Sequence, residues 1–244
     1  MSTRNSTNSA NVTHLSKITI GRLISDIKKI RAEPLEDSNI YYRHDEENIL
    51  RGYAMIVGYK GTPYEYGYYL FEFNFPTNYP FSPPSLVYST NDGSTRFNPN
   101  LYINGKVCLS VLNTWKGEQW TSCQTISSIL LTLATILNDK PLVNEPGISE
   151  THRDFEKYNK IIRFKNYQVA IMRMLKKEVL PDDFGIFYEI MCEQYKKNKG
   201  AIIEGLTDLS KSKDENTIIS TGIYNLQARI NYERLLEDFN KLDV

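Results

Sequence analysis

The sequence of 244 residues contains only three cysteines, at positions 108, 123 and 192. Cysteines this few and this scattered exclude a disulfide framework, and no two have the spacing of a zinc site. No run of about 18 apolar residues occurs, which excludes a membrane-spanning helix. Residues 1–16 are rich in Ser, Thr and Asn and lack the apolar centre of a signal peptide. We therefore expect a metal-free protein of the reducing cytoplasm or nucleus, without membrane contact.

The sequence also lacks an excess of charge of either sign, with 29 Lys and Arg against 29 Asp and Glu. This balance argues against bulk binding of nucleic acid. Locally the charge is uneven, because Lys17 to Arg31 holds five basic residues and one acid, Asp26. This basic segment is a candidate partner surface, and an ordinary solvated helix face explains it equally well.

What is present is ordinary for a globular protein: 41% hydrophobic residues and 24% charged residues, enough for one sizeable core. Apolar residues at helical spacing predict a helix over residues 18–30. Residues 33–48 read as polar turn material. Tyr, Phe, Ile and Val then dominate residues 51–57 and 64–75, which predict a β-hairpin, and residues 85–90 predict a further strand.

The second half of the sequence is predominantly helical in pattern. Residues 124–137 predict a buried apolar helix, and the chain after Glu150 reads as helical almost to its end, with breaks at Pro181 and Gly200. Strands grouped between helices predict an α+β domain followed by a helical extension.

The irregular stretch of residues 91–119 carries the candidate chemistry. It contains Asn98 and Asn100 on either side of a proline, and Cys108 eight residues after the second Asn. An Asn amide near a thiol can donate to the oxyanion of a tetrahedral intermediate. Taken alone, however, Cys108 between Val107 and Leu109 reads as a small buried hydrophobe.

Four motifs in order resemble those of the ubiquitin-conjugating enzymes, over roughly residues 18–165. They are Tyr-Pro-Phe-Ser-Pro-Pro at 79–84, Asn-Pro-Asn at 98–100, Cys-Leu at 108–109, and Trp120 with the apolar helix after it. The family's usual form is His-Pro-Asn eight residues before the catalytic Cys. Further runs, Arg-Phe-Asn-Pro-Asn-Leu-Tyr, Gly-Lys-Val-Cys-Leu-Ser, Asn-Thr-Trp and Asn-Glu-Pro-Gly, are similar to the Z-type large enzymes and to the conjugating domain of Bruce.

The resemblance implies the ubiquitin-conjugating (UBC) fold. Its expected parts are an N-terminal helix, an antiparallel meander of about four strands, a central buried helix, C-terminal helices and an extra helical extension. We accordingly predict a disordered tail over residues 1–16, a catalytic domain over 17–165 and the extension over 166–244.

The resemblance also implies a thioester mechanism without a cofactor, because only the upstream activating enzyme uses ATP. Cys108 is then the residue that carries the modifier, and Asn100 stabilises the oxyanion or orders the loop. Asn98 replaces the family's His as a loop brace. Ser110 stands where many members have an Asp that orients or deprotonates the incoming lysine. Glu145 is a candidate for the acidic gate residue, and an exposed loop acid is the equally good alternative.

Two surfaces for protein partners are implied by position. The ligase surface consists of Phe81, Thr121 and Ser122. The docking face for the activating enzyme consists of Arg22, Lys28 and Lys29. Cys123, after the ligase loop, is expected to pack beneath the following helix, and a surface thiol is the alternative.

The activity expected from the resemblance is transfer of ubiquitin to a substrate lysine or to a ligase. The alternatives are an enzyme for a ubiquitin-like modifier and a non-catalytic UBC-like binding module. A cysteine hydrolase needs a base beside the thiol, and the three histidines, His14, His44 and His152, form no protease signature. The extension either pads the core or selects partners.

Overall fold

The computed structural model describes residues 15–244, so residues 1–14 of the predicted tail lie outside the described residues. The first helix, α1 (Lys17–Ala32), begins where the Ser16 hydroxyl accepts the backbone N–H of Thr19 at 3.0 Å. It buries Leu23 and Ile30, the apolar stripe that the sequence predicts.

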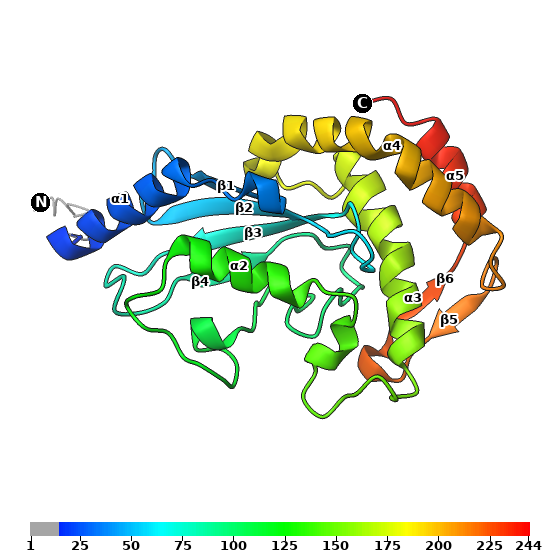
Figure 1. Ribbon diagram of the computed structural model, residues 1–244, viewed down its shortest axis with the longest axis horizontal. Helices are drawn as coiled ribbons and strands as arrows, with labels where there is room; N and C mark the ends of the chain where they lie inside the picture. Colours follow the sequence, from blue (N-terminus) through cyan, green and yellow to red (C-terminus); the bar gives the residue numbers. More distant parts are fainter. Residues whose placement is uncertain (1–14) are drawn as a thin grey trace, which may run out of the picture.

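A four-stranded antiparallel sheet follows, with its strands in the order of the chain (Figure 1). The strands are β1 (Ile40–His44), β2 (Arg51–Val57), β3 (Tyr68–Asn74) and β4 (Ser85–Tyr88). The predicted hairpin of β2 and β3 and the predicted strand β4 are confirmed. The interpretation of residues 33–48 as turn material is wrong for β1, because Ile40 and Tyr41 pair with Ile56 and Met55 of β2.

Helix α2 (Ile126–Ile136) is the predicted central helix. Its start is fixed by a capping box, in which Thr125 and Ser128 each bond the other's backbone N–H. Ile129, Leu130 and Leu133 are wholly buried, as a helix in the middle of the core requires.

The chain continues through α3 (Phe155–Lys165) into a π-helical stretch (Asn166–Arg173) without a break. Asn166 is fully buried there, and its side-chain amide is hydrogen-bonded on both sides. Its Nδ2 donates to Glu65 O at 2.8 Å, and its Oδ1 accepts from the Tyr69 hydroxyl at 2.7 Å. The predicted boundary after Lys165 therefore falls within continuous helical backbone.

The extension contains α4 (Tyr188–Ser210), a hairpin of β5 (Ile218–Ser220) and β6 (Gln227–Arg229), and α5 (Tyr232–Asn240). The break at Pro181 is confirmed by the turn that starts at Asp182. Two predictions are wrong. Gly200 lies inside α4, and residues 218–229 form a hairpin rather than a helix.

The extension covers one face of the sheet. The Tyr68 hydroxyl of β3 donates to Met191 O at 2.8 Å, and Gln194 of α4 donates to the Tyr41 hydroxyl at 2.8 Å. The other face turns toward the segment that follows β4, where Tyr69 meets Phe97 with ring centroids 6.0 Å apart. The sheet is thus buried on both sides, and a single apolar core joins the two halves of the chain.

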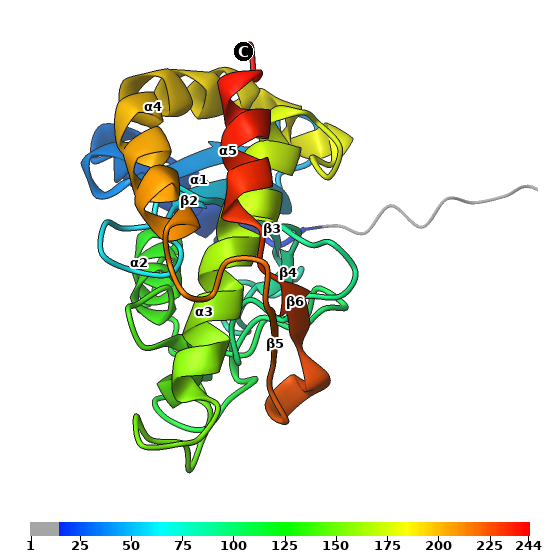
Figure 2. The same ribbon diagram turned by 90° about the vertical axis from the view of Figure 1, so that its right-hand side faces the viewer.

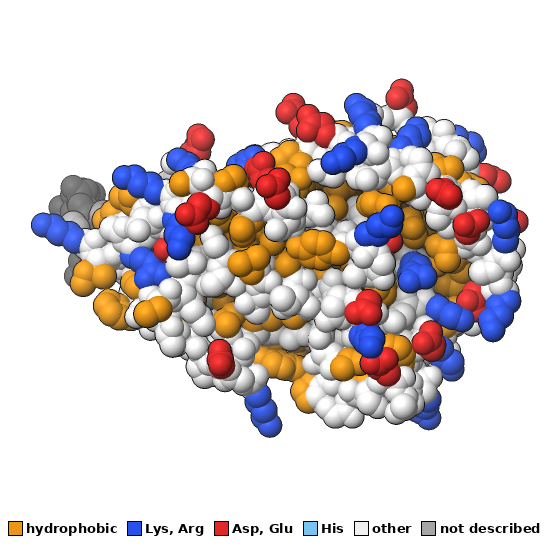
Figure 3. Space-filling model, in the orientation of Figure 1, with side chains coloured by type: hydrophobic (Ala, Val, Ile, Leu, Met, Phe, Trp, Pro, Cys, Tyr) orange, Lys and Arg blue, Asp and Glu red, His pale blue; other side chains and the backbone are white. Residues whose placement is uncertain are grey.

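Acidic and basic side chains are interspersed over the face of the molecule shown in Figure 3, so that face carries no large patch of one sign. Among residues 15–244, no helix has the length and apolar character needed to cross a membrane.

Candidate active site

The segment from Phe97 to Leu109 folds back on itself beside β4. Isolated bridges join Asn98 to Leu101 and Leu101 to Val107. Gly105 fastens the loop to the sheet, since its carbonyl accepts the N–H of Tyr88 at 2.8 Å. Its φ of +87° suits glycine, and a Cβ there would lie 3.0 Å from Val87 Cγ1. The approach of this loop to the sheet therefore depends on glycine.

Asn98 is fully buried and braces the loop. Its Nδ2 donates to the Tyr64 hydroxyl at 2.8 Å and to Ile136 O at 2.7 Å, and its Oδ1 accepts the N–H of Asn100 at 2.9 Å. These are the contacts that a bracing role requires, with an amide in place of the imidazole that the resemblance leads one to expect.

Asn100 is bonded directly to the backbone of the candidate nucleophile. Its Nδ2 donates to Cys108 O at 2.6 Å, and the N–H of Cys108 donates to Asn100 O at 2.9 Å. Asn100 Oδ1 is buried and has no hydrogen-bond partner among the described residues. The sequence motif thus places the two predicted catalytic residues in contact.

Cys108 itself is shielded, with an exposed fraction of only 2%. It is nevertheless not a member of the apolar core cluster to which Val107 and Leu109 belong. Thr114 holds the segment closed, since its hydroxyl accepts from Leu109 N at 2.9 Å and donates to Val107 O at 3.1 Å. The interpretation of Cys108 as a small buried residue is therefore correct for its exposed fraction.

Ser110 begins a short 3₁₀ turn directly after this segment. The exposed loop that follows packs back onto it, because a Cβ built on Gly117 would lie 3.0 Å from Ser110 Cβ. A hydroxyl thus occupies the position where the resemblance leads one to expect a carboxylate.

Glu145 follows a 3₁₀ turn at Pro141–Asn144 and is half-buried. Its carboxylate accepts a hydrogen bond from the Tyr224 hydroxyl. Burial, together with this bond to Glu145, raises the pKa of Tyr224, so the hydroxyl stays a donor. The reading of Glu145 as a simple exposed loop acid is therefore wrong.

Sequence reasoning missed Tyr224 and its other partner, Arg96. The Arg96 guanidinium lies between two aromatic rings, 3.8 Å from the centroid of Tyr102 and 4.1 Å from that of Tyr224. No local signal could have found the contacts of Tyr224, because it lies in the extension, 79 residues after Glu145 and still farther along the chain from Arg96.

The predicted ligase surface is accessible: Phe81 is 66% exposed, and Thr121 and Ser122 are exposed. Cys123 beside them is exposed too, which corrects the expectation that it packs beneath α2. Its position in the turn before the Thr125 cap keeps it outside the helix face that is buried.

The predicted basic face of α1 divides into two parts. Lys28 and Lys29 are exposed, as expected. Arg22 instead makes hydrogen bonds within the protein. Its Nε donates to Asp26 Oδ1 at 3.0 Å, and its Nη1 donates to Ser122 O at 2.5 Å. This corrects the expectation of a free Arg22, whose guanidinium ties α1 to the loop before α2.

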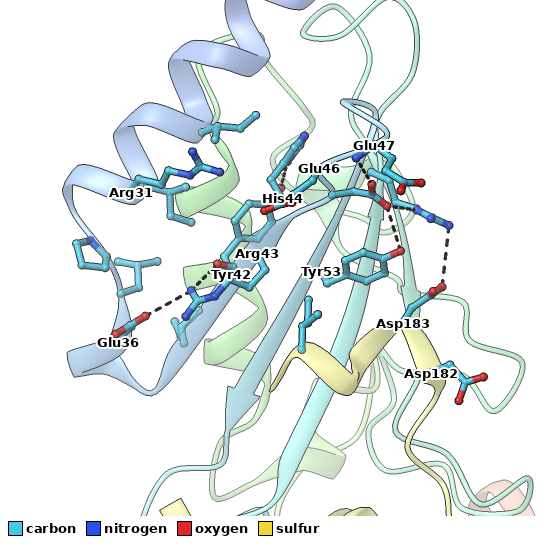
Figure 4. A pocket seen from close by; sticks show the side chains of 18 residues that line it. Arg31, Glu36, Tyr42, Arg43, His44, Glu46, Glu47, Tyr53, Asp182 and Asp183 are labelled. Atoms are coloured by element: carbon cyan, nitrogen blue, oxygen red, sulfur yellow. Dashed lines mark hydrogen bonds and ion pairs between the residues drawn. The ribbon is translucent and has the colours of Figure 1, made fainter. Parts of the chain in front are cut away.

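A cavity of about 820 Å³ lies elsewhere, between α1, β1 and the turn at Asp182 (Figure 4). Residues of both charge signs line it, among them Arg31, Glu36 and Asp183. It contains none of the predicted site residues. The described residues include no cluster of three or more His, Cys, Asp or Glu arranged to hold a metal.

The family model described as ubiquitin-conjugating enzyme matches residues 22–166 of the chain. The chain belongs to the ubiquitin-conjugating enzyme family. Ubiquitin-conjugating enzyme E2 Z of Xenopus tropicalis is 36% identical over 187 residues, which cover 70% of this chain and 59% of that protein. The human E2 Z is 35% identical over 187 residues, covering 70% of this chain and 52% of that protein.

These relatives confirm both the family resemblance and its Z-type placement. The chain spans little more than half the length of the relatives it matches. The solved structure of human ubiquitin-conjugating enzyme E2 G1 aligns with a TM-score of 0.43 at 24% identity, covering 50% of this chain and 94% of that one. The family assignment rests on the sequence comparisons.

Proposed function

We propose that this chain accepts ubiquitin, or a ubiquitin-like modifier, as a thioester on Cys108 and passes it to a substrate lysine or to a ligase. The observation that carries the proposal is the contact between Asn100 and Cys108 within the loop braced by Asn98. Family membership supports it, because the relatives are named ubiquitin-conjugating enzymes.

In the charging step, the Cys108 thiolate attacks the carbonyl carbon of the activating enzyme's thioester. The new S–C bond forms as the activating enzyme's thiolate leaves. In the second step a lysine amine attacks the Cys108 thioester, the amine passes a proton to a base, for which we propose the Glu145 carboxylate, and the Cys108 thiolate leaves as the amide bond forms. No cofactor takes part on this chain. Cys108 must be a reduced thiol before each charging step, which suits the cytoplasm or nucleus that we propose as its location.

Asn100 is placed to act on the tetrahedral intermediate of either step. Its amide nitrogen already lies at the Cys108 backbone, so a small rotation would let its second N–H reach an oxyanion on the carbon bonded to sulfur. Loss of such a donor typically lowers a rate by about 100–1,000-fold. Ser110 offers no carboxylate. We therefore propose that the Glu145 carboxylate is the base that takes the proton from the incoming amine.

The proposed partners follow from the exposed surfaces. The activating enzyme would dock on the α1 face that presents Lys28 and Lys29, and a ligase would contact Phe81 with Thr121 and Ser122. Arg22 supports both surfaces from inside, since it joins α1 to the backbone of Ser122.

The test is a charging assay with purified activating enzymes, ATP, ubiquitin and several ubiquitin-like modifiers. We expect an adduct that reducing agent removes and that Cys108→Ala abolishes, whereas Cys108→Ser gives an ester resistant to reductant. Cys123→Ala is the matched control, because it removes an exposed thiol and should charge normally. No adduct with any modifier would favour a non-catalytic binding module instead.

A further inference from the structure

The β5–β6 hairpin of the extension reaches the loops of the candidate active site. It lies beside α3 (Figure 2), where Asp154 anchors it. Asp154 is 3% exposed, and its Oδ2 accepts the backbone N–H groups of Gly222 at 2.9 Å and Ile223 at 3.0 Å. Burial alone would raise the pKa of Asp154, but these two hydrogen bonds, together with the nearby Arg153 and His152 side chains, lower the pKa below its usual value, so the anchor is ionised.

Tyr224 stands at the tip that Asp154 holds. Its φ of +59° is unusual for a residue with a Cβ. The hydroxyl donates to Glu145, and the ring covers the Arg96 guanidinium. A tyrosine held in this conformation by contacts on two loops points to a role beyond packing.

The contacts of Tyr224 with Glu145 and with Arg96 both connect to the backbone of Cys108 through neighbouring polar residues. On one side is Asn144, the residue before Glu145. Its Nδ2 donates to Ile136 O at 3.0 Å and lies 3.4 Å from Asn98 Oδ1. On the other side, Arg96 donates to Pro99 O at 2.6 Å, between the two Asn residues of the motif. Asn98 and Asn100 complete the path to the Cys108 backbone.

We propose that Tyr224 is a positioning residue, through which the C-terminal extension fixes the Glu145 loop and the Asn-Pro-Asn loop for transfer of the acyl group from Cys108 to an amine. This inference rests on the proposed function and deepens it. Charging needs the thiol to be uncovered, whereas transfer also needs an incoming amine to be oriented and deprotonated. With Ser110 lacking a carboxylate, the carboxylate that Tyr224 holds serves that second step.

The test compares Tyr224→Phe with the unmodified chain. The variant keeps the ring over Arg96 and loses only the hydroxyl that reaches Glu145. We expect charging within about twofold of normal and an unchanged unfolding midpoint. Single-turnover discharge of the thioester to free lysine should slow by about 10-fold at saturating lysine, because small displacements at a reacting centre cost rate steeply.

The matched control is Tyr188→Phe. Tyr188 is also a half-buried tyrosine of the extension, but its hydroxyl donates to Leu175 O at 2.8 Å, at the far end of α4 from the hairpin. This variant should discharge at the normal rate. A discharge rate in Tyr224→Phe equal to that of Tyr188→Phe would overturn the inference, and so would equal slowing of charging and discharge.

A double variant separates action through Glu145 from general loosening. If the hydroxyl acts through the carboxylate, Tyr224→Phe slows discharge less in a Glu145→Gln background than in the normal one. Equal slowing in both backgrounds would contradict the path proposed here. If the unmodified chain forms no thioester, the proposed function fails; if it charges but Tyr224→Phe discharges normally, only this inference fails.

Discussion

At the scale of single residues, the three cysteines differ chiefly in exposure. Cys108 is 2% exposed, Cys192 is intermediate and Cys123 is exposed. A thiol reacts as its thiolate and only where a reagent can reach it. Cys108 must therefore spend part of the time uncovered if it is to accept an acyl group. We expect the Thr114 contacts to loosen then, because they hold the backbone on both sides of Cys108.

Alkylation with iodoacetamide should reveal this difference. We expect Cys123 to react first and Cys108 to react at least about 10-fold more slowly, because reaction of the buried thiol waits for the segment to open. Mass spectrometry of peptides over time gives both rates in one sample. Thr114→Ala should speed alkylation of Cys108 without changing that of Cys123. Equal rates for the two thiols in the unmodified chain would show that the covering seen in the structure does not persist in solution.

The candidate site was predictable where a local motif specifies it and unpredictable elsewhere. Asn98, Asn100 and Cys108 lie within eleven residues of sequence, and the loop brings them together as the motif predicts. Tyr224 has no such motif, and only the folding of the extension places it against Glu145. The hydrogen bond from Arg22 to the Ser122 carbonyl was hidden likewise, because Ser122 is 100 residues away in the chain.

At the scale of elements, the predictions succeeded where apolar periodicity is strong and failed where pairing decides. Helices α1 and α2 and the β2–β3 hairpin follow their patterns. Strand β1 ends in the polar residues Arg43 and His44, and it forms because β2 offers a partner. Residues 218–229 carry apolar residues near helical spacing, yet hydrogen bonds across the hairpin and the Asp154 anchor stabilise a strand pair. Such tertiary contacts override local propensity.

The end of β1 depends on an uncharged histidine. His44 Nε2 lies 2.9 Å from Ile49 O, and Nδ1 lies 2.7 Å from the Tyr42 hydroxyl (Figure 4). A carbonyl oxygen only accepts, so Nε2 carries the proton and Nδ1 accepts from Tyr42. Burial, aided by the charge of Arg31, lowers the pKa of His44 below 6.5, although the bond to Ile49 and the charge of Asp45 act the other way.

This lowered pKa predicts a loss of stability in mild acid. Below about pH 6.5 the unfolded chain binds a proton at His44 before the folded chain does, so the free energy of unfolding falls as the pH drops toward the folded-state pKa. Urea unfolding at pH 7.5 and 5.5 measures the difference. His44→Gln should cost about 1 kcal/mol at pH 7.5 and should reduce the fall between the two pH values. A fall of the same size in the variant would assign the pH dependence to other groups.

At the scale of the whole molecule, the extension is part of the core that supports the site. Five large side chains of the extension are at most 1% exposed: Phe187, Met191, Tyr195, Ile202 and Leu206. Phe184 adds an edge contact to Tyr53 of β2, with ring centroids 5.3 Å apart. Hydrogen bonds from Tyr68 to Met191 O and from Gln194 to Tyr41 join these helices to the same face of the sheet, so the first half of the chain relies on the extension to bury that face.

Truncation after Lys165 should therefore prevent folding rather than merely alter partner choice. Each fully buried large apolar side chain contributes roughly 1.5–3 kcal/mol, so losing five of them removes an amount comparable with the whole stability of a typical domain, about 5–15 kcal/mol. We expect the truncated chain to lose its cooperative thermal transition, while truncation after Asn240, which spares every helix, should retain it. A cooperative transition in the 1–165 chain would show that the catalytic half folds alone. The extension would then act on the site only through contacts such as that of Tyr224, and its removal should slow discharge from Cys108 while leaving charging intact.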